Sequence, residues 1–279
     1  MTMVIKNHSM PVNMNHIVGS HHIVLITLDS LRFDVAQEAW AKGLTPNIAK
    51  FLPDDGWQRC HTPGNFTYPA HQAFFSGFLP TPASPGLHPR LFASRFSGAT
   101  TTVDETFICD QPTIVEGLAE QGYHTICIGG VGFFNKTTPL SSTFTDMFVE
   151  SHWQESFGVT DPDSAKTQIN FAVERVKQIA TQQKLFLFIN ISAIHQPNFF
   201  YLDNPDWIAR KDSVKSQQAA LIYVDSQLPI LFSAIRETGP LFCVLCSDHG
   251  DAYGEDGFYG HRLNHEVVLT VPYTHFVWD

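Results

Sequence analysis

The sequence predicts an α/β fold, a doubly wound and mostly parallel sheet with helices on both faces. Two observations predict it. Short aliphatic and β-branched runs recur along the chain, as in strands buried on both faces, and amphipathic helical stretches separate them. The runs cover 21–28, 124–128, 185–191 and 241–246, and the two longest helical stretches cover 163–183 and 215–238. Parallel pairing follows because a helix joins each strand to the next.

Length and composition indicate one large domain. The chain has 279 residues, of which 43% are hydrophobic, so it can bury a sizeable core. We expect the polar residues 1–20 to be a flexible N-terminal arm and residues 21–279 to form a single domain. The net charge of −10 and the lack of a basic stretch argue against nucleic-acid binding.

The cysteines and the hydropathy pattern bear on cellular location. Five cysteines, an odd number, fit a reduced, cytoplasmic chain better than a disulfide scaffold. The N-terminus has no apolar core of signal-peptide length, and no stretch of 18 residues is uninterruptedly apolar. We therefore expect a cytoplasmic protein without a membrane partner. The sequence leaves the oligomeric state open.

Helix-start and turn residues place the smaller elements. Thr45-Pro46 is typical of an N-cap and first helical residue, so a short helix is expected from there to Asp55-Gly56. The other expected elements are strands at 57–61, 144–149 and 271–278 and a helix at 111–121.

Residues 78–110 are rich in Pro, Ser, Thr and Gly and form a long excursion. Long loops in compact domains are often functional. Arg90 and Arg95 lie in it and would either contact an anion or be ordinary surface charges.

Polar residues follow three of the expected strands. Asp29 comes directly after the first, His195 shortly after the one at 185–191, and Asp248-His249 after the one at 241–246. Ligands bind at the carboxyl ends of strands in open α/β sheets, and Asp and His are suitable ligands for a divalent ion. Each residue alone is more simply a cap, a turn or a solvated group. Their shared placement favours a site.

Thr67 lies at a helix start. Pro69 fits the first turn of a helix that ends at Gly77, which places Thr67 at or near the N-cap. Thr67 could simply cap the helix. Alternatively, its hydroxyl lies where the helix dipole favours negative charge, and a neighbouring metal could make it a nucleophile.

Five segments occur in a characteristic order along the chain. They are IVLITLDSLRFD, TIVEGLAEQGYHTICIGG, FLFINISAIHQP, AALIYVDSQL and SDHGDAYGEDGFYGH, the last followed by HEVVLTVPYTHFVW. Together they resemble the alkaline phosphatase superfamily, in particular its sulfatase and phosphoethanolamine or glycerol-phosphate transferase branch. The resemblance extends over about residues 22–279.

The resemblance implies a metal site. Asp29, Asp248 and His249 would bind one divalent ion, Zn, Mn, Mg or Ca, and Thr67 at the nucleophile position would also touch it. The family's second acidic ligand is Ser30 here, and the Asp-x-x-x-His pair of bimetallic members is not evident. One tight site is therefore expected, and a second ion is left open.

The resemblance also implies two catalytic histidines. His195 would face the leaving group or a non-bridging oxygen, and His261 would contact the transferred group. The family's usual C-terminal subdomain is expected to be absent, which leaves open whether a partner supplies it.

The sequence departs from the sulfatase pattern at the nucleophile. Sulfatases carry C/S-x-P-x-R, whereas this chain reads Thr67-Tyr68-Pro69-Ala70-His71. Threonine cannot become formylglycine, and His71 replaces the arginine. The resemblance therefore implies phosphoryl rather than ordinary sulfatase chemistry.

The expected function is metal-dependent hydrolysis or transfer of a phosphate ester, with a small anionic ester as substrate and a covalent intermediate on Thr67. One alternative is a sulfate or phosphonate ester hydrolase that uses the same residues. Another is a binding protein that keeps the fold and has lost turnover.

Overall fold

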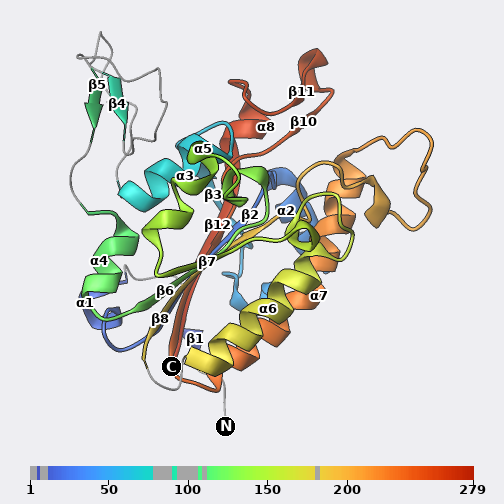
Figure 1. Cartoon of the computed structure of the whole chain (residues 1–279). Helices are drawn as coiled ribbons and strands as arrows, with labels where there is room; N and C mark the ends of the chain where they lie inside the picture. The colour runs from blue at the N-terminus through green and yellow to red at the C-terminus, as the bar shows by residue number, and fades with distance from the viewer. Residues whose placement is uncertain (1–4, 7–11, 78–89, 93–105, 109–111, 180–182) are drawn as a thin grey trace.

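The computed structural model describes residues 5–6, 12–77, 90–92, 106–108, 112–179 and 183–279. Its main feature is an eight-stranded sheet in the order β1-β12-β9-β2-β8-β6-β7, with β3 also paired to β12 (Figure 1). Neighbouring strands in the series β9, β2, β8, β6 and β7 are parallel, and β12 is antiparallel to β9. The predicted mostly parallel α/β sheet is confirmed.

The described strands are β1 Ile5–Lys6, β2 His22–Leu28, β3 Gln58–His61, β4 Arg90–Phe92, β5 Thr106–Ile108, β6 His124–Ile128, β7 Glu150–His152, β8 Leu185–Ile191, β9 Leu241–Cys246, β10 Ala252–Tyr253, β11 Tyr259–Gly260 and β12 Thr270–Trp278. The described helices are α1 Met14–Ile17, α2 Phe33–Ala41, α3 Thr67–Ser76, α4 Ile114–Glu120, α5 Pro139–Ser142, α6 Ser164–Ile179, α7 Val214–Arg236 and α8 Glu266–Leu269. Short 3-10 helices are η1 Ile48–Phe51, η2 Gly132–Phe134, η3 Thr145–Met147, η4 Glu155–Phe157, η5 Phe199–Tyr201 and η6 Glu255–Gly257.

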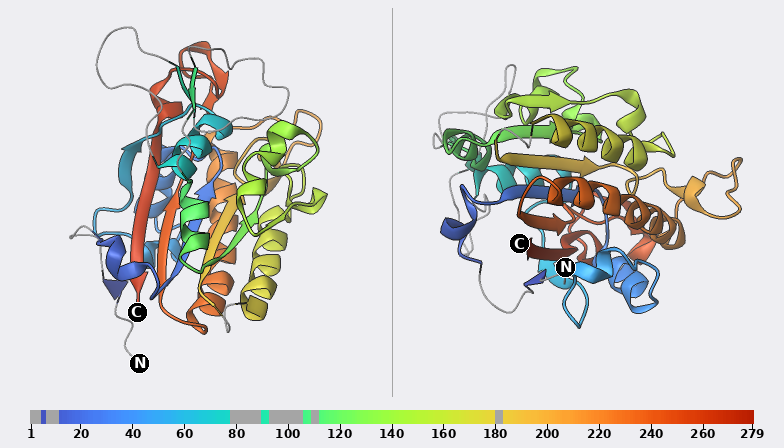
Figure 2. Two further views of the ribbon diagram at one scale, coloured as in Figure 1. Left: turned by 60° about the vertical axis from the view of Figure 1, so that its left-hand side comes forward. Right: turned by 90° about the horizontal axis from the view of Figure 1, so that it is seen from below.

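Helices cover both faces of the sheet because each face buries its own apolar cluster. One cluster joins β2, β8 and β9 to α2, α6 and α7. The other joins the opposite face of the sheet to α1, α3 and α4. Figure 1 shows the two groups of helices on opposite sides, and the left view of Figure 2 shows β12, in red, running the height of the sheet.

The predicted strand at 144–149 is wrong. Residues Thr145–Met147 form the 3-10 turn η3, and the strand β7 begins at Glu150. Phe144 and Phe148 are buried because their rings pack on Phe75, at centroid distances of 5.5 and 5.6 Å. The aromatic residues therefore fill the core from a turn, which the apolar pattern alone does not distinguish from a strand.

The predicted helix from Thr45 to Asp55-Gly56 is reduced to the single turn η1. The carboxylate of Asp225 in α7 accepts the backbone N–H groups of Asn47 and Ile48, at 3.3 and 2.7 Å. A distant side chain thus satisfies the free N–H groups at the start of the turn.

Residues 1–20 were expected to be a flexible arm, but two parts of this segment have regular structure. Ile5–Lys6 pair with β12, and Asn13 caps the helix α1 by accepting the N–H of Asn15 at 3.1 Å. Ile17 of α1 is buried in the cluster on that face.

The cysteines Cys60, Cys127, Cys243 and Cys246 form no disulfide. Cys243 and Cys246 have a C-x-x-C spacing, which the sequence analysis did not take into account. They lie on β9, where side chains three residues apart point to opposite faces. Burial raises the pKa of the Cys243 thiol, so the pair lacks the features of a redox motif.

Among the described helices, α7 is long and apolar enough to cross a membrane by length and composition. However, 50% of its most apolar window is buried inside the fold, so this is weak evidence for a span.

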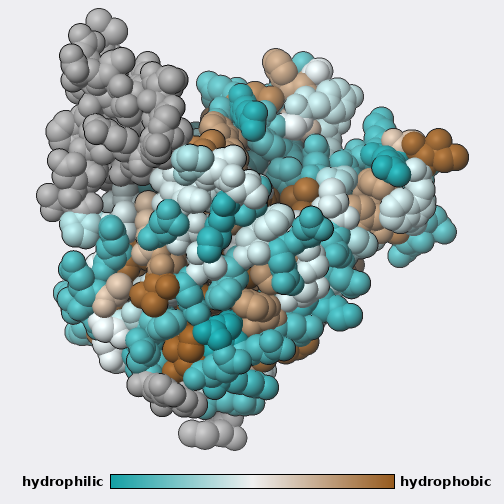
Figure 3. All heavy atoms as spheres, viewed as in Figure 1, coloured by the Kyte–Doolittle hydropathy of each residue, from teal (hydrophilic) through white to brown (hydrophobic). Residues whose placement is uncertain are grey.

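The loop after η5 exposes two apolar side chains, because Trp207 is 57% and Ile208 is 97% exposed. This loop projects on the right in Figure 3, where its surface is partly brown, that is, hydrophobic.

Truncation of Phe188 in the centre of β8 is expected to destabilise the protein. Its ring is fully buried and packs on Phe75, Phe134 and His71 at centroid distances of 5.1–5.5 Å. Phe188→Ala should lower the free energy of unfolding by about 3–5 kcal/mol, measured by urea unfolding. Phe258→Ala, at a half-exposed ring, is the control and should change it by less than about 1 kcal/mol. Equal losses would contradict this role of Phe188.

His22, at the start of β2, is expected to make stability depend on pH. Its Nδ1 accepts the N–H of Leu185 at 3.1 Å, and burial and the charge of Lys184 lower its pKa. The folded protein therefore binds fewer protons, and the free energy of unfolding falls as pH drops through the unfolded pKa of about 6.5. Urea unfolding at pH 7.5 and 5.5 should show a smaller loss in His22→Asn than in the wild type. The same loss in both would contradict it.

Candidate functional site

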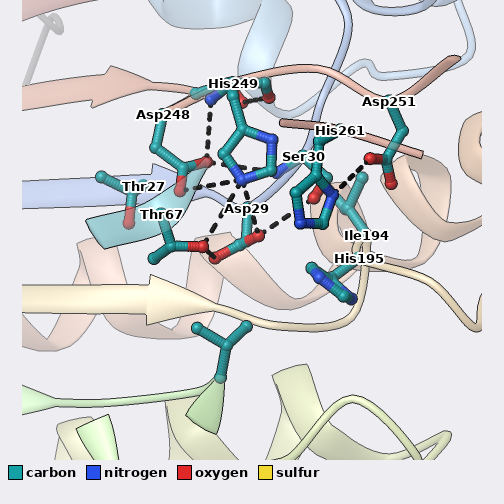
Figure 4. A network of polar contacts seen from close by, with 12 residues as sticks. Thr27, Asp29, Ser30, Thr67, Ile194, His195, Asp248, His249, Asp251 and His261 are labelled. Carbon is teal, nitrogen blue, oxygen red and sulfur yellow. Dashed lines mark hydrogen bonds and ion pairs between the residues drawn. The ribbon is translucent and has the colours of Figure 1, made fainter. Parts of the chain in front are cut away.

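The predicted site residues meet at one edge of the sheet. Asp29 follows β2, Asp248 and His249 follow β9, and His195 lies four residues beyond β8. These three strands are neighbours and parallel, so their carboxyl ends open on the same side. Figure 4 shows the side chains converging there, together with Thr67 and His261.

Thr67 reaches the same edge of the sheet from the start of helix α3. Thr67 is the first residue of the helix, after Phe66 as N-cap, and is only 2% exposed. Its Oγ1 lies 3.5 Å from Asp29 Oδ2 and 3.4 Å from His249 Nε2. The hydroxyl therefore sits at the positive end of the helix dipole, between two candidate ligands.

The donor atoms fit a divalent ion. His249 Nε2 lies 3.8 Å from Asp29 Oδ1 and 3.5 Å from Asp248 Oδ2. Four ligands at about 2.0–2.2 Å from a tetrahedral ion lie about 3.3–3.6 Å apart, close to these separations and to those of Thr67. Asp248 Oδ2 is buried without a hydrogen-bond partner, and a cation there would satisfy it.

The ionisable groups are consistent with a site for a cation. Burial raises the pKa of Asp29, but His195, His249 and the Asn190 amide outweigh it and leave that pKa below the usual range. Burial and the charge of Asp29 raise the pKa of Asp248 well above the usual range. Two buried carboxylates therefore repel each other where no cation separates them.

Hydrogen bonds orient the candidate ligands. His249 Nδ1 donates to the carbonyl of Gly250 at 3.0 Å, which leaves the Nε2 lone pair free to bind an ion. Ser30, with φ of 67°, donates its backbone N–H to Asp248 Oδ1 and its hydroxyl to Asp29 Oδ1, at 3.2 and 3.0 Å. Ser30 therefore orients both carboxylates and does not itself take the place of the family's second acidic ligand.

Asn190 is a further supporting residue that the sequence interpretation missed. Its amide nitrogen donates to Asp29 Oδ2 at 2.9 Å and to Thr27 Oγ1 at 3.2 Å. The signal was present, because Asn190 is the polar side chain in the otherwise apolar run Leu185–Ile191.

Gly250 is required by a close approach of two chain segments. A Cβ at this position would lie 2.1 Å from the carbonyl oxygen of Val267 and 3.1 Å from Arg32 Cγ. Its φ is not positive, so the glycine serves packing rather than an unusual backbone angle.

His71 does not supply the charge of the arginine that it replaces. It is fully buried, donates from Nδ1 to the Thr67 carbonyl at 2.8 Å and accepts the Thr27 hydroxyl on Nε2 at 3.1 Å. Burial lowers its pKa to about 4, so it is neutral at pH 7. Its role is to support the start of α3.

The two predicted catalytic histidines are neighbours, with ring centroids 5.5 Å apart. His261 Nδ1 bonds to Oδ1 of the buried Asp251 at 2.7 Å, so its Nε2 is the atom available to a ligand. Asp251 was missed, although it lies only two residues after His249. His249, Asp251 and His261 also form a metal-compatible group, but its His249 already faces the first site.

The predicted anion contacts of the 78–110 excursion fall mostly outside the described part of the chain. Arg95 lies outside it, and for Arg90 only the backbone, in β4, is described.

Comparison with known proteins places the fold. The family model described as Sulfatase matches residues 21–273. Among solved structures, the chain is similar to the periplasmic domain of EcEptC from Escherichia coli in complex with Zn (13% identity, 94% and 74% of the two chains covered, TM-score 0.59). It is likewise similar to the soluble domain of lipooligosaccharide phosphoethanolamine transferase A from Neisseria meningitidis (14%, 93% and 77%, 0.59).

A further similar structure is a protein in the alkaline phosphatase superfamily from Vibrio parahaemolyticus (17% identity, 92% and 60% covered, TM-score 0.55). No curated protein sequence matches the chain. The comparisons give no support to the expected cytoplasmic location, because EcEptC is described as periplasmic there.

Proposed function

Because this chain belongs to the sulfatase family of the alkaline phosphatase superfamily, we propose that it transfers or hydrolyses a phosphate ester with the Thr67 hydroxyl as nucleophile. The observation that carries the proposal is the position of Thr67. Its oxygen lies at a helix start and within 3.5 Å of two groups, Asp29 and His249, that can hold a cation. The neighbours named as phosphoethanolamine transferases support phosphoryl chemistry.

The proposed cofactor is one divalent ion held by Asp29, Thr67, Asp248 and His249. When bound, it polarises the ester and lowers the pKa of the Thr67 hydroxyl. Zn is the first ion to test, because the donor atoms include an imidazole nitrogen at near-tetrahedral separations and EcEptC is described in complex with Zn.

The residues of this chain then act in two steps. The Thr67 hydroxyl gives its proton to solvent, and its Oγ1 forms a bond to phosphorus while the bond to the leaving oxygen breaks; His195 or His261 gives that oxygen a proton. Water, or an acceptor alcohol in a transferase, then attacks the phosphothreonine and gives its proton back to the same histidine, and the bond from phosphorus to Thr67 Oγ1 breaks. Asp251 keeps His261 in the tautomer and orientation that this proton transfer needs.

The preference for phosphate over sulfate rests on two residues. Thr67 cannot be converted to formylglycine, and the arginine of the sulfatase pattern is replaced by His71, which is buried and neutral. A metal-free sample supplied in turn with Zn, Mn, Mg and Ca should hydrolyse 4-nitrophenyl phosphate at least about tenfold faster than the matching sulfate, in kcat/KM.

Either other result changes the proposal. Faster turnover of the sulfate would identify a sulfate ester hydrolase. Metal binding without turnover of any ester would identify a binding protein of this fold.

Loss of the Asn190 amide is expected to weaken the site without removing a ligand. Asn190→Leu keeps the volume but leaves Asp29 Oδ2 without its 2.9 Å donor. Removal of a residue that orients a ligand typically lowers metal affinity or activity by about 10- to 100-fold. Metal titration and kcat/KM should both show this loss. Gln178→Leu, on the surface of α6, is the control. Unchanged metal affinity in Asn190→Leu would contradict the assignment.

A further inference from the structure

A cavity of about 550 Å3 opens beside the two histidines. His195 and His261 line one side of it, and Phe133 and Leu140 contribute an apolar wall. In the proposed reaction one of these two histidines protonates the leaving oxygen. The cavity beyond them is therefore where the leaving part of the substrate lies.

Arg262 also lines this cavity and is the one permanent cation among the described residues that line it. It directly follows His261, and its backbone has a φ of 70°, which is uncommon for a residue with a side chain. Its N–H donates to the carbonyl of Asn65 at 2.8 Å, and its guanidinium carbon lies 5.3 Å from the centre of the Phe66 ring. Both contacts fix Arg262 to the segment that leads into the nucleophile.

Arg262 differs from several other arginines of the chain because no carboxylate neutralises its charge. Arg32, Arg59 and Arg175 each form an ion pair with an aspartate or glutamate. Arg262 has no carboxylate partner in the described part of the chain; it is exposed and lines the cavity. An aromatic ring on one face leaves the donors at its edge free to bind a planar anion.

We infer that Arg262 recognises a second anionic group, such as a carboxylate, on the leaving part of the substrate. The inference rests on the proposed function, because it takes the transferred group to be bound at Thr67. The apolar wall then accommodates the carbon chain between the two anions. The substrate class is a phosphate ester whose organic part carries its own negative charge.

The effect of a second negative charge on ligand affinity can be used to test this recognition. The chain has a net charge of −10, so a second negative charge on a ligand weakens binding unless a local cation compensates for it. A charge-assisted pair with Arg262 should reverse that effect. The sign of the preference therefore reports on this residue.

The test is equilibrium binding of matched phosphonates by calorimetry. Phosphonoacetate, 3-phosphonopropionate and 4-phosphonobutyrate are each compared with the alkylphosphonate in which a methyl group replaces the carboxylate. In the wild type with one equivalent of Zn, at least one carboxylate should bind about tenfold or more tighter than its partner. In Arg262→Gln the ratio of the two affinities should fall to about 1 or below, and Arg262→Lys should keep part of the preference.

Arg236→Gln is the matched control, because Arg236 ends α7 at the opposite edge of the sheet. The ratio should stay at its wild-type value there. Alkylphosphonate binding with no preference for a carboxylate, or a preference that survives in Arg262→Gln, would overturn this inference alone. Failure of all six compounds to bind would overturn both it and the proposed function.

Discussion

Thr67→Ala is expected to lower kcat for phosphate-ester hydrolysis by at least about a thousandfold. The substitution removes the oxygen that lies 3.4 Å from His249 Nε2 and is proposed to form the bond to phosphorus. Water cannot replace it efficiently, because the site would lose the positioned nucleophile at the start of α3. Initial rates on 4-nitrophenyl phosphate measure the effect, and mass spectrometry of the wild type after rapid quenching should detect phosphothreonine.

Two variants separate chemistry from folding. Thr67→Ser keeps the hydroxyl and should retain more activity than Thr67→Ala. Thr274 on β12 has an equally buried hydroxyl, which donates to the carbonyl of Phe51. Its removal in Thr274→Ala should leave kcat within about twofold. If Thr67→Ala keeps a tenth of the wild-type rate, Thr67 is not the nucleophile.

The periodicity of the sequence predicts the part of the site that is built on core strands, whereas Thr67 is predicted from a helix start and His261 from the family resemblance. Asp29, His195 and Asp248 each follow a run of apolar residues, and parallel strands place their carboxyl ends at one edge. Periodicity and strand polarity are therefore sufficient to bring them together. The bounds of β8 and β9 match the prediction for the same reason.

The rest depends on contacts between segments far apart in the chain. Asn190 on β8 reaches Asp29 at the end of the neighbouring strand β2, and Arg262 contacts Phe66 from a loop almost 200 positions later. Sequence patterns report local periodicity and do not report such pairings. The error at 144–149 has the same origin, because Phe144 and Phe148 are apolar on account of the tertiary aromatic cluster.

Asp248→Asn is expected to have opposite effects on activity and on the stability of the metal-free protein. The wild type should bind about one equivalent of a divalent ion and lose it in the variant, with kcat reduced by at least about a thousandfold. Without metal, however, Asp248 is a buried carboxylate next to Asp29, and both burial and that charge raise its pKa. The neutral amide removes this repulsion, so the metal-free variant should melt at a higher temperature than the metal-free wild type.

Elemental analysis and thermal unfolding with and without a chelator measure both effects. A ligand at a hundred times its Kd stabilises the folded state by about 2.7 kcal/mol, so the wild-type Tm should rise on adding metal and that of Asp248→Asn should not. Asp54→Asn, on an exposed turn, is the matched control and should keep the metal response. A metal response that persists in Asp248→Asn would place the ion elsewhere, whereas a lower Tm of the metal-free variant would mean that Asp248 stabilises the turn through its bonds to Ser30 and His249.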